Sequence, residues 1–268
     1  MTIQPFNKED IGRFLELAAA ERWVAEPWEF AFLLSAFPEG CFSARDETGA
    51  AGFVTSLRHE RSGWIGNLIV DERHRGKGVG QALFVRSMEA LCEAGAETVW
   101  LTASKMGKSL YERHGFASAD AILRWTGQGK GHAVSSRCFR ALLDADIDEM
   151  GWGDRREALL EVVGGRGSVL ASGFGFTIIQ PCGRAVQIGP LAALNSAHAA
   201  LLLDDALAEI APGVKVYIDA PAGNREVARL LQQRGFRSQG TNELMYAGVK
   251  PAYRPEYIYA LATMGSCG

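Results

Sequence analysis

Apolar residues along the first 126 positions switch between helical and strand periodicity. Helical spacing covers 6–20 and 81–92, and apolar runs of strand length cover 65–70 and 98–102. The same patterns, with glycine and proline as stops, predict further helices at 29–37 and 107–114. They also predict a hairpin with strands at 41–45 and 50–58 and a last strand at 116–125. The chain is therefore expected to be an α/β (α+β) protein.

A glycine-rich turn joins the apolar strand at 65–70 to the following helix. Its residues are Arg75, Gly76, Lys77, Gly78, Val79 and Gly80. Glycines let backbone N–H groups converge where a side chain would block them, and the start of a helix adds unpaired N–H groups. The turn is expected to bind a phosphate or pyrophosphate; the alternative is a glycine-rich turn without a ligand.

The spacing of the glycines decides between nucleotide motifs. A Walker loop needs Ser or Thr after its lysine, but Gly78 follows Lys77. The spacing also differs from the dinucleotide motif G-x-G-x-x-G. Arg75, Gly78 and Gly80 form R-x-x-G-x-G, which resembles the coenzyme A loop of the GCN5-related N-acetyltransferase (GNAT) superfamily. About 35 residues on, LYERHGF at 110–116 resembles the family's L-Y-E-x-x-G-F segment.

This resemblance implies a mixed, mostly antiparallel sheet flanked by helices and a binding site for acetyl-CoA as co-substrate. The pyrophosphate would lie on the amides of 76–80, with Arg75 and Lys77 either adding charge or pointing to solvent. The pantetheine arm would pair with the main chain of Leu68, Ile69 and Val70, as an added strand does.

The family mechanism is a direct attack of an amine on the thioester. By resemblance, the N–H of Leu68 would polarise the thioester carbonyl, and Tyr111 would protonate the leaving thiolate. A phenol with a pKa near ~10 can give that proton at neutral pH; the alternative for Tyr111 is a core aromatic. Ser104 stands where many family members carry a coenzyme-contacting Asn.

The sequence says less about the residues that bind the acceptor amine. A protonated amine needs a base, and the sequence leaves four candidates without choosing one: Glu26, Glu29, His59 and Glu72. Three further residues are candidates for lining the acceptor pocket, although both tryptophans also fit a packing role: Asn67, Trp23 and Trp28.

A Gly-rich stretch at 127–131 predicts a flexible linker between two domains. We expect an acetyl-CoA-binding domain at 1–127, a linker at 128–134 and a degenerate domain of the same fold at 135–268. Three segments recur in order, at 66–68 and 189–191, 99–101 and 216–218, and 114–116 and 234–236. The second copy resembles the C-terminal domain of YitH-type tandem GNAT proteins. It has Asn224 at the position of Ser104 but no glycine loop.

Composition narrows the class of partner. A net charge of -3 gives no electrostatic case for nucleic acid, and no apolar run reaches the ~20 residues of a membrane span. The N-terminus shows no signal peptide, and the five cysteines are scattered without metal-ligand spacing. We therefore expect a cytoplasmic protein, monomeric or homodimeric, with no metal.

The predicted function is N-acetyl transfer from acetyl-CoA to the primary amine of a small molecule or peptide, with one acetyl-CoA per chain. The alternative is a non-catalytic acyl-CoA sensor or pseudoenzyme. An intact glycine loop beside Tyr111 favours the enzyme.

Overall fold

The computed structural model describes residues 1–47, 49–131 and 145–268. Its first part runs in the order β1 (Thr2–Pro5), α1 (Ile11–Ala20), α2 (Pro27–Ala36), β2 (Phe42–Asp46), β3 (Gly49–Arg58), β4 (Ser62–Val70), α3 (Val79–Glu93), β5 (Thr98–Ala103), α4 (Lys108–Arg113) and β6 (Ala117–Gln128). Each element expected from periodicity is present. Strand β1 was not predicted, because four residues are too few to show a period.

The second part has a matching order after two helices. It consists of α5 (Ala145–Trp152), α6 (Glu157–Arg166), β7 (Ser168–Ser172), β8 (Gly175–Cys182), β9 (Ala185–Ala193), α7 (Ser196–Glu209), β10 (Lys215–Pro221), α8 (Arg225–Gln233), β11 (Arg237–Gly248) and β12 (Ile258–Ala260). Within the described residues no helix is long and apolar enough to cross a membrane.

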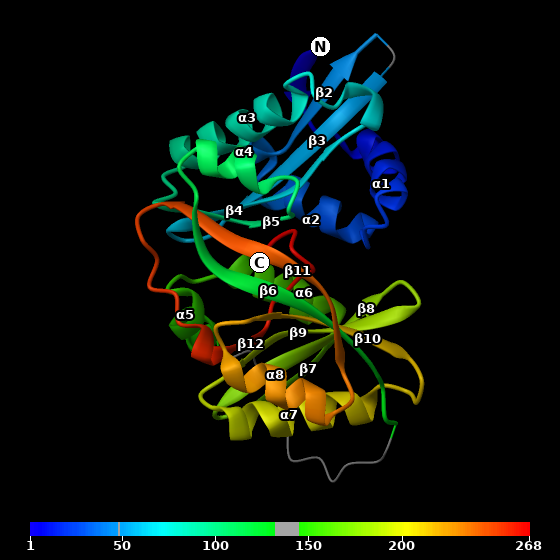
Figure 1. The fold of residues 1–268 in the computed structure, drawn as a ribbon, viewed down its shortest axis with the longest axis vertical. Coiled ribbons are helices and arrows are strands. Elements are labelled where there is room, and N and C mark those ends of the chain that lie inside the picture. Colours follow the sequence, from blue (N-terminus) through cyan, green and yellow to red (C-terminus); the bar gives the residue numbers. More distant parts are fainter. Residues whose placement is uncertain (48, 132–144) are drawn as a thin grey trace.

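All the described strands belong to one sheet in the order β1-β2-β3-β4-β5-β11-β6-β10-β9-β8-β7, with β12 beside β9. Two pairs are parallel, β4 with β5 and β9 with β10, and the other pairs are antiparallel. The predicted mixed, mostly antiparallel sheet is therefore confirmed. In Figure 1, helices α3 and α4 lie on one side of the upper sheet and α1 and α2 on the other.

The two parts exchange their last long strands. Strand β11, from the end of the chain, pairs with β5, while β6 pairs with β10. The two exchanged strands also pair with each other. Figure 1 shows them side by side where the upper and lower parts meet. The exchange makes the two parts continuous through the sheet.

Helices α4 and α8 end in the same way. Gly115 and Gly235 have positive φ (84° and 82°), and the following N–H groups of Phe116 and Phe236 return to the carbonyls five residues before them. This is the Schellman ending, which needs glycine at the left-handed position. The repeat at 114–116 and 234–236 therefore marks the same local structure twice.

Side chains that alternate along a strand belong to different hydrophobic clusters on the two faces of the sheet. In β3, Phe53 packs with Phe14 and Phe30 of α1 and α2, whereas its neighbour Val54 packs with Phe84 of α3 on the other face. A third cluster, centred on Trp64, joins the two parts. The α1 and α2 side of the sheet therefore faces the second part of the chain.

The glycine-rich stretch at 127–131 continues the sheet and then packs on the second part. Gly127 and Gln128 lie in β6, paired with Val216 and Lys215. The N–H groups of Gly129 and Lys130 bond to carbonyls of Val214 and Leu207. Positions 132–134 of the predicted linker, and 135–144 beyond it, lie outside the described residues. The domain boundaries remain a prediction.

Candidate active site

Strands β4 and β5 separate halfway along their length. Their parallel pairing runs from Ser62 with Thr98 to Ile65 with Leu101 and stops there. At this point β4 has a register irregularity against β3, and Asn67 takes a positive φ of 55°. A non-glycine residue in this conformation is uncommon and is typical of functional sites. The separation leaves the β5 side of 66–70 available to a ligand.

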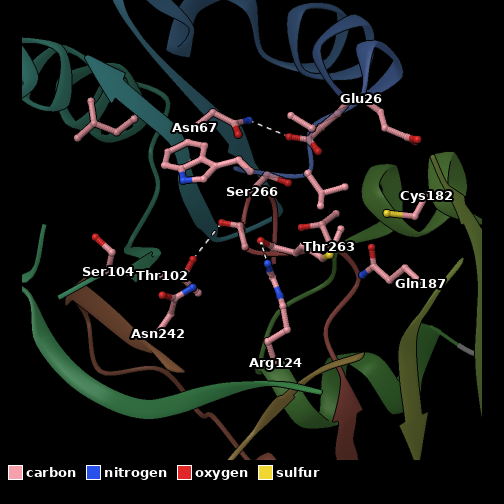
Figure 2. A pocket seen from close by; sticks show the side chains of 18 of the residues that line it. Glu26, Asn67, Thr102, Ser104, Arg124, Cys182, Gln187, Asn242, Thr263 and Ser266 are labelled. Carbon is pink, nitrogen blue, oxygen red and sulfur yellow. Dashed lines mark hydrogen bonds between the residues drawn. The ribbon is translucent and has the colours of Figure 1, made fainter. Parts of the chain in front are cut away.

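A cavity of about 350 Å³ lies at this separation, between the two parts of the chain. This volume is in the range of small-molecule sites. Besides β4, β5 and α4, its walls come from the α1–α2 connection, α2, β6, β8, β9, β11 and the segment 263–266. Figure 2 shows labelled side chains from both parts converging on it.

Three of the predicted site residues line this cavity: Leu68, Ser104 and Tyr111. The other predicted residues lie outside its wall, further along β4 or in the turn before α3: Ile69, Val70, Arg75, Gly76, Lys77, Gly78, Val79 and Gly80. The turn is still adjacent, because a Cβ on Gly80 would lie 3.5 Å from the side chain of Val70. The predicted residues thus follow one path from the cavity along β4 to the start of α3.

Tyr111 is held by the aromatic core while it reaches the cavity. Its ring lies 5.2 Å from that of Phe84 and 6.1 Å from that of Phe116, centroid to centroid. Burial raises the pKa of its hydroxyl to about 12. Tyr111 is therefore part of the hydrophobic core and also lines the cavity. Its phenol is protonated at any ordinary pH.

The structure separates the four base candidates. Glu26 and Glu29 line the cavity, whereas His59 and Glu72 do not. Glu26 is engaged by Trp28 Nε1 at 3.0 Å, by Arg166 at 3.3 Å and by the Gly183 N–H at 2.6 Å.

Glu29 is the more deeply buried acid of the cavity. Its carboxylate accepts a hydrogen bond of 2.8 Å from Asn67 Nδ2. Burial raises its pKa, and the nearby Asn67 and Ser266 side chains oppose the rise by favouring the charged form. Glu29 therefore lies in the cavity, and its pKa is shifted in the direction that makes a carboxylate a stronger base.

The turn before α3 has the features of an anion site. Gly76 and Gly78 have φ of 73° and 80°, and a Cβ on either would meet nothing within 4 Å. Gly78 is the N-cap of α3 and supplies no side-chain cap, so the first amides of the helix keep their donors. The Arg75 guanidinium bonds to the Val70 carbonyl at 2.9 Å and to Glu21, which fixes the turn against β4. Lys77, in the same turn, is exposed.

The corresponding slot in the second part is filled by the chain itself. There β9 and β10 separate after Gln187 and Tyr217, and β12 pairs with Leu191 and Ala192 of β9. Asn224 donates to the Ile258 carbonyl of β12 at 3.0 Å. Asn224 thus bonds to a strand of the protein itself.

The helix that follows β9 is also closed to an anion. The Asn195 side chain caps α7 by accepting from the N–H groups of Ala197 and His198 at 3.0 and 3.2 Å. In α3 the same place is taken by Gly78, which offers no cap. Only the first of the two helix starts therefore presents its amides to a ligand.

Much of the cavity wall was missed from the sequence. It comprises Arg124, Gln180, Cys182, Gln187, Asn242 and the segment 263–266. No local motif marks these residues, because strand exchange and the return of the chain end bring them to the site. The predicted candidates Asn67, Trp23 and Trp28 do line the cavity. In the described ranges no cluster of three or more His, Cys, Asp or Glu could hold a metal.

Comparisons with known proteins agree with this geometry. Two profiles described as "Acetyltransferase (GNAT) domain" match residues 38–118 and 145–260. A holothin acyltransferase of Pseudoalteromonas sp. (strain SANK 73390) is 26% identical over 98% of this chain and 93% of its own. The N-alpha-acetyltransferase MAK3 of Arabidopsis thaliana is 26% identical over 41% of this chain, which spans 64% of that protein.

Solved structures share the fold over the whole chain. A Pyrococcus horikoshii protein assigned as an acetyltransferase has a TM-score of 0.87 at 22% identity, covering 100% of this chain and 95% of that one. A GCN5-related N-acetyltransferase from Sphaerobacter thermophilus has a TM-score of 0.65 at 16% identity, covering 94% and 98%. The two domain matches and this fold show that the chain belongs to the GCN5-related N-acetyltransferase (GNAT) superfamily, as an acyltransferase with two GNAT domains in tandem.

Proposed function

We propose that the protein transfers an acetyl group from acetyl-CoA to a primary amine that attacks the thioester directly. The observation that carries this proposal is the separation of β4 from β5 beside a glycine-capped helix start, with Tyr111 and Glu29 in one cavity. The described residues fit the coenzyme, because the turn has room where side chains would obstruct a pyrophosphate and the strand edge has unpaired length.

Coenzyme binding is assigned to main-chain groups. The amides of 76–80 would hold the pyrophosphate, with Lys77 adding charge and Arg75 holding the turn. The main chain of Leu68, Ile69 and Val70 would pair with the pantetheine arm, and Ser104 lies across the separation from Leu68. Bound acetyl-CoA supplies the activated thioester carbonyl, and the Leu68 N–H is suited to stabilise the oxyanion that forms there.

Two side chains would handle the protons. Glu29 takes the proton that the amine loses as its nitrogen bonds to the acetyl carbon. Tyr111 gives a proton to the thiolate as the carbon–sulfur bond breaks, and regains one from solvent. No enzyme nucleophile is needed, because the amine itself displaces the thiol.

The acceptor class follows from the cavity wall. Glu26, Glu29, Trp23 and Trp28 line the cavity, and Arg166 already pairs with Glu26 and lies over the Trp28 ring. The cavity wall also includes Arg22 and Arg124, of which Arg124 is paired with Asp219. The Glu29 carboxylate and the Trp23 indole are the groups that favour a cation. We therefore propose a small amine or an exposed peptide amine that is protonated in solution.

One acetyl-CoA is expected per chain. In the second part β12 takes the place of the pantetheine arm, and Asn195 takes the place of the pyrophosphate. Titration calorimetry should give a stoichiometry of one. A value of two would mean that β12 leaves its slot.

Turnover tests the whole proposal. Acetyl-CoA and a panel of primary amines are mixed with the protein, and released thiol is followed with a chromogenic reagent after correction for the exposed Cys92. Matched tertiary amines, which cannot form an amide, serve as controls. We expect release that depends on the primary amine and is lost in Glu29→Gln. Tight coenzyme binding without release for any amine would instead support an acyl-CoA sensor.

A further inference from the structure

Strand β4 has one residue more than its partner strand at the point where it leaves β5. Thr55 of β3 lies opposite Gly66 of β4. Phe53, two positions back along β3, lies opposite Ile69, three positions on along β4. This irregularity is a β-bulge, and Asn67, with its φ of 55°, lies within it. Bulges redirect side chains and are frequent beside active sites.

The bulge brings the Asn67 side chain to the α2 face of the sheet. Before the bulge, Ile65 packs with the cluster on the α3 side, and regular alternation would place residue 67 on that side too. After the bulge, Ile69 packs instead with the cluster on the α1 and α2 side. The alternation has therefore shifted by one residue, and the Asn67 amide reaches Glu29 of α2.

The Asn67 amide joins two acceptors on this face. Its Nδ2 donates to Glu29 Oε1 at 2.8 Å and to Thr55 Oγ1 at 3.1 Å, and the dashed line from Asn67 in Figure 2 marks the bond to Glu29. Thr55 is fully buried and donates its own proton to the Gly66 carbonyl at 3.4 Å. Because an ionised carboxylate only accepts hydrogen bonds, the amide has to present its N–H groups to Glu29.

The same bond restrains the carboxylate of Glu29. This residue lies in the first turn of α2, is buried and lines the cavity. A single N–H occupies one of about four acceptor positions of a carboxylate, so others remain for an amine. Because the bond limits rotation of the carboxylate, the same lone pairs meet each incoming amine.

We propose that Asn67 is a positioning residue for acyl transfer: its amide, turned onto the α2 face by the bulge and held by Thr55, orients the Glu29 carboxylate toward the incoming amine. One irregularity of β4 then serves both substrates, because it separates β4 from β5 for acetyl-CoA and directs the base to the amine. The proposal rests on the function proposed above, in which Glu29 is the base.

The surroundings of Glu29 give the sign of the effect on its pKa. Burial raises this pKa most, and the Asn67 amide is the largest of the influences that lower it. The titratable or charged groups that face Glu29 from neighbouring elements are Glu26 of the α1–α2 connection, Arg166 of α6, Cys182 of β8 and Cys267. Burial raises the pKa of both thiols, so they stay neutral in an assay. Loss of the Asn67 amide should therefore raise the pKa of Glu29 further.

The test is the pH profile of kcat/KM, measured on the full chain with acetyl-CoA and an active amine. Asn67→Gly removes the amide, and glycine adopts a positive φ without strain. Its acidic limb should move to higher pH, with kcat/KM on that limb about tenfold lower and with unchanged affinity for acetyl-CoA in calorimetry. Asn67→Asp, which also tolerates a positive φ, places a second negative charge beside Glu29 and should move the limb further.

Thr55 offers a matched pair of variants away from the cavity wall. Thr55→Val keeps the shape of the side chain but removes the hydroxyl that holds the Asn67 amide. Its acidic limb should move in the same direction as that of Asn67→Gly, by a smaller amount. Thr55→Ser keeps a hydroxyl and should retain the wild-type profile.

The contrary outcomes separate this inference from the proposed function. An unshifted limb in Asn67→Gly, or an equal fall in kcat/KM at every pH, would overturn the role of Asn67; with Glu29→Gln inactive, the proposed function would stand. Full activity in Glu29→Gln would overturn the base itself and, with it, this inference. If Asn67→Gly does not fold or loses affinity for acetyl-CoA, the Thr55 pair decides, and equal profiles for Thr55→Val and Thr55→Ser would overturn the proposal.

Discussion

The Tyr111 hydroxyl keeps its proton over the whole range of an enzyme assay, because burial raises its pKa to about 12. Tyr111→Phe should lower kcat about 10- to 100-fold and leave the affinity for acetyl-CoA unchanged, because the ring packing is kept. Tyr246→Phe is the matched control: Tyr246 packs on Trp100, away from the cavity. An unchanged kcat in Tyr111→Phe would leave Tyr111 with a packing role only.

A second residue-scale prediction concerns stability in acid. Burial, with Arg156 nearby, lowers the pKa of His59 to about 3, and its Nε2 has no hydrogen-bond partner. The unfolded chain, where histidine titrates near ~6.5, binds the proton more readily. Between pH about 6.5 and 3, His59 therefore lowers the free energy of unfolding progressively.

Denaturant titration from pH 7 to pH 4 measures this loss. His59→Gln, which cannot take up the proton, should show a smaller fall in the free energy of unfolding. His114→Gln, a partly exposed position at the end of α4, should keep the wild-type dependence. Equal falls in His59→Gln and the wild type would rule out this source of acid sensitivity.

At the scale of single residues, the sequence could identify the site residues that belong to a local motif. Tyr111, Leu68 and Ser104 were reached through the family pattern, and all three line the cavity. Glu29 was only one of four candidates, because its burial and its bond to Asn67 depend on tertiary packing. The segment 263–266 had no signal at all, since Thr102 and Arg124, which bond to it, are more than a hundred residues away in the chain.

Among the elements, α3 offers the sharpest test of coenzyme binding. Gly78 and Gly95 stand at its two ends, both with positive φ (80° and 82°) and with open space at the Cβ position. Gly78→Glu places bulk and negative charge at the helix start, where an anion should bind. Gly95→Glu imposes the same backbone strain at the other end.

Calorimetric titration with acetyl-CoA compares the two variants. We expect Gly78→Glu to abolish measurable binding and Gly95→Glu to bind as the wild type does, although both lose stability. Retained affinity in Gly78→Glu would place the pyrophosphate away from this turn. Loss in both variants would make strain, and not position, the cause.

Two elements show which structural features periodicity in the sequence cannot predict. Helix α3 was expected from 81 but begins at Val79, directly after Gly78, which takes the left-handed conformation at the N-cap position. The place of strand β12 in the slot between β9 and β10 was not predicted, because pairing between distant strands leaves no periodic pattern in the sequence.

Across the whole molecule, strand exchange should make unfolding cooperative. The first domain depends on β11 for the neighbour of β5, and the second depends on β6 for the neighbour of β10. Neither half of the sheet can unfold without removing a strand from the other half. Scanning calorimetry of the full chain should therefore give one transition, coincident with the loss of tryptophan signal; two separated peaks would contradict this.

The repeat of two GNAT folds was readable from recurring segments, and both domain matches confirm it. The exchange between them was not, because either pairing of β6 and β11 buries the same alternating side chains. The sequence therefore indicated the two units but left open their mutual arrangement.

Strand β12, Leu261 and residues 262–268 follow one another along the chain, and Leu261 and Ser266 each approach a glycine at an equivalent place. A Cβ on Gly189 would lie 2.0 Å from the Leu261 oxygen, as one on Gly66 would lie 2.1 Å from that of Ser266. The slot of the second domain that corresponds to the proposed coenzyme slot of the first thus anchors a wall of the first domain's cavity. Under the proposed function, substitutions in the second domain should therefore be able to change which acceptor the first domain uses.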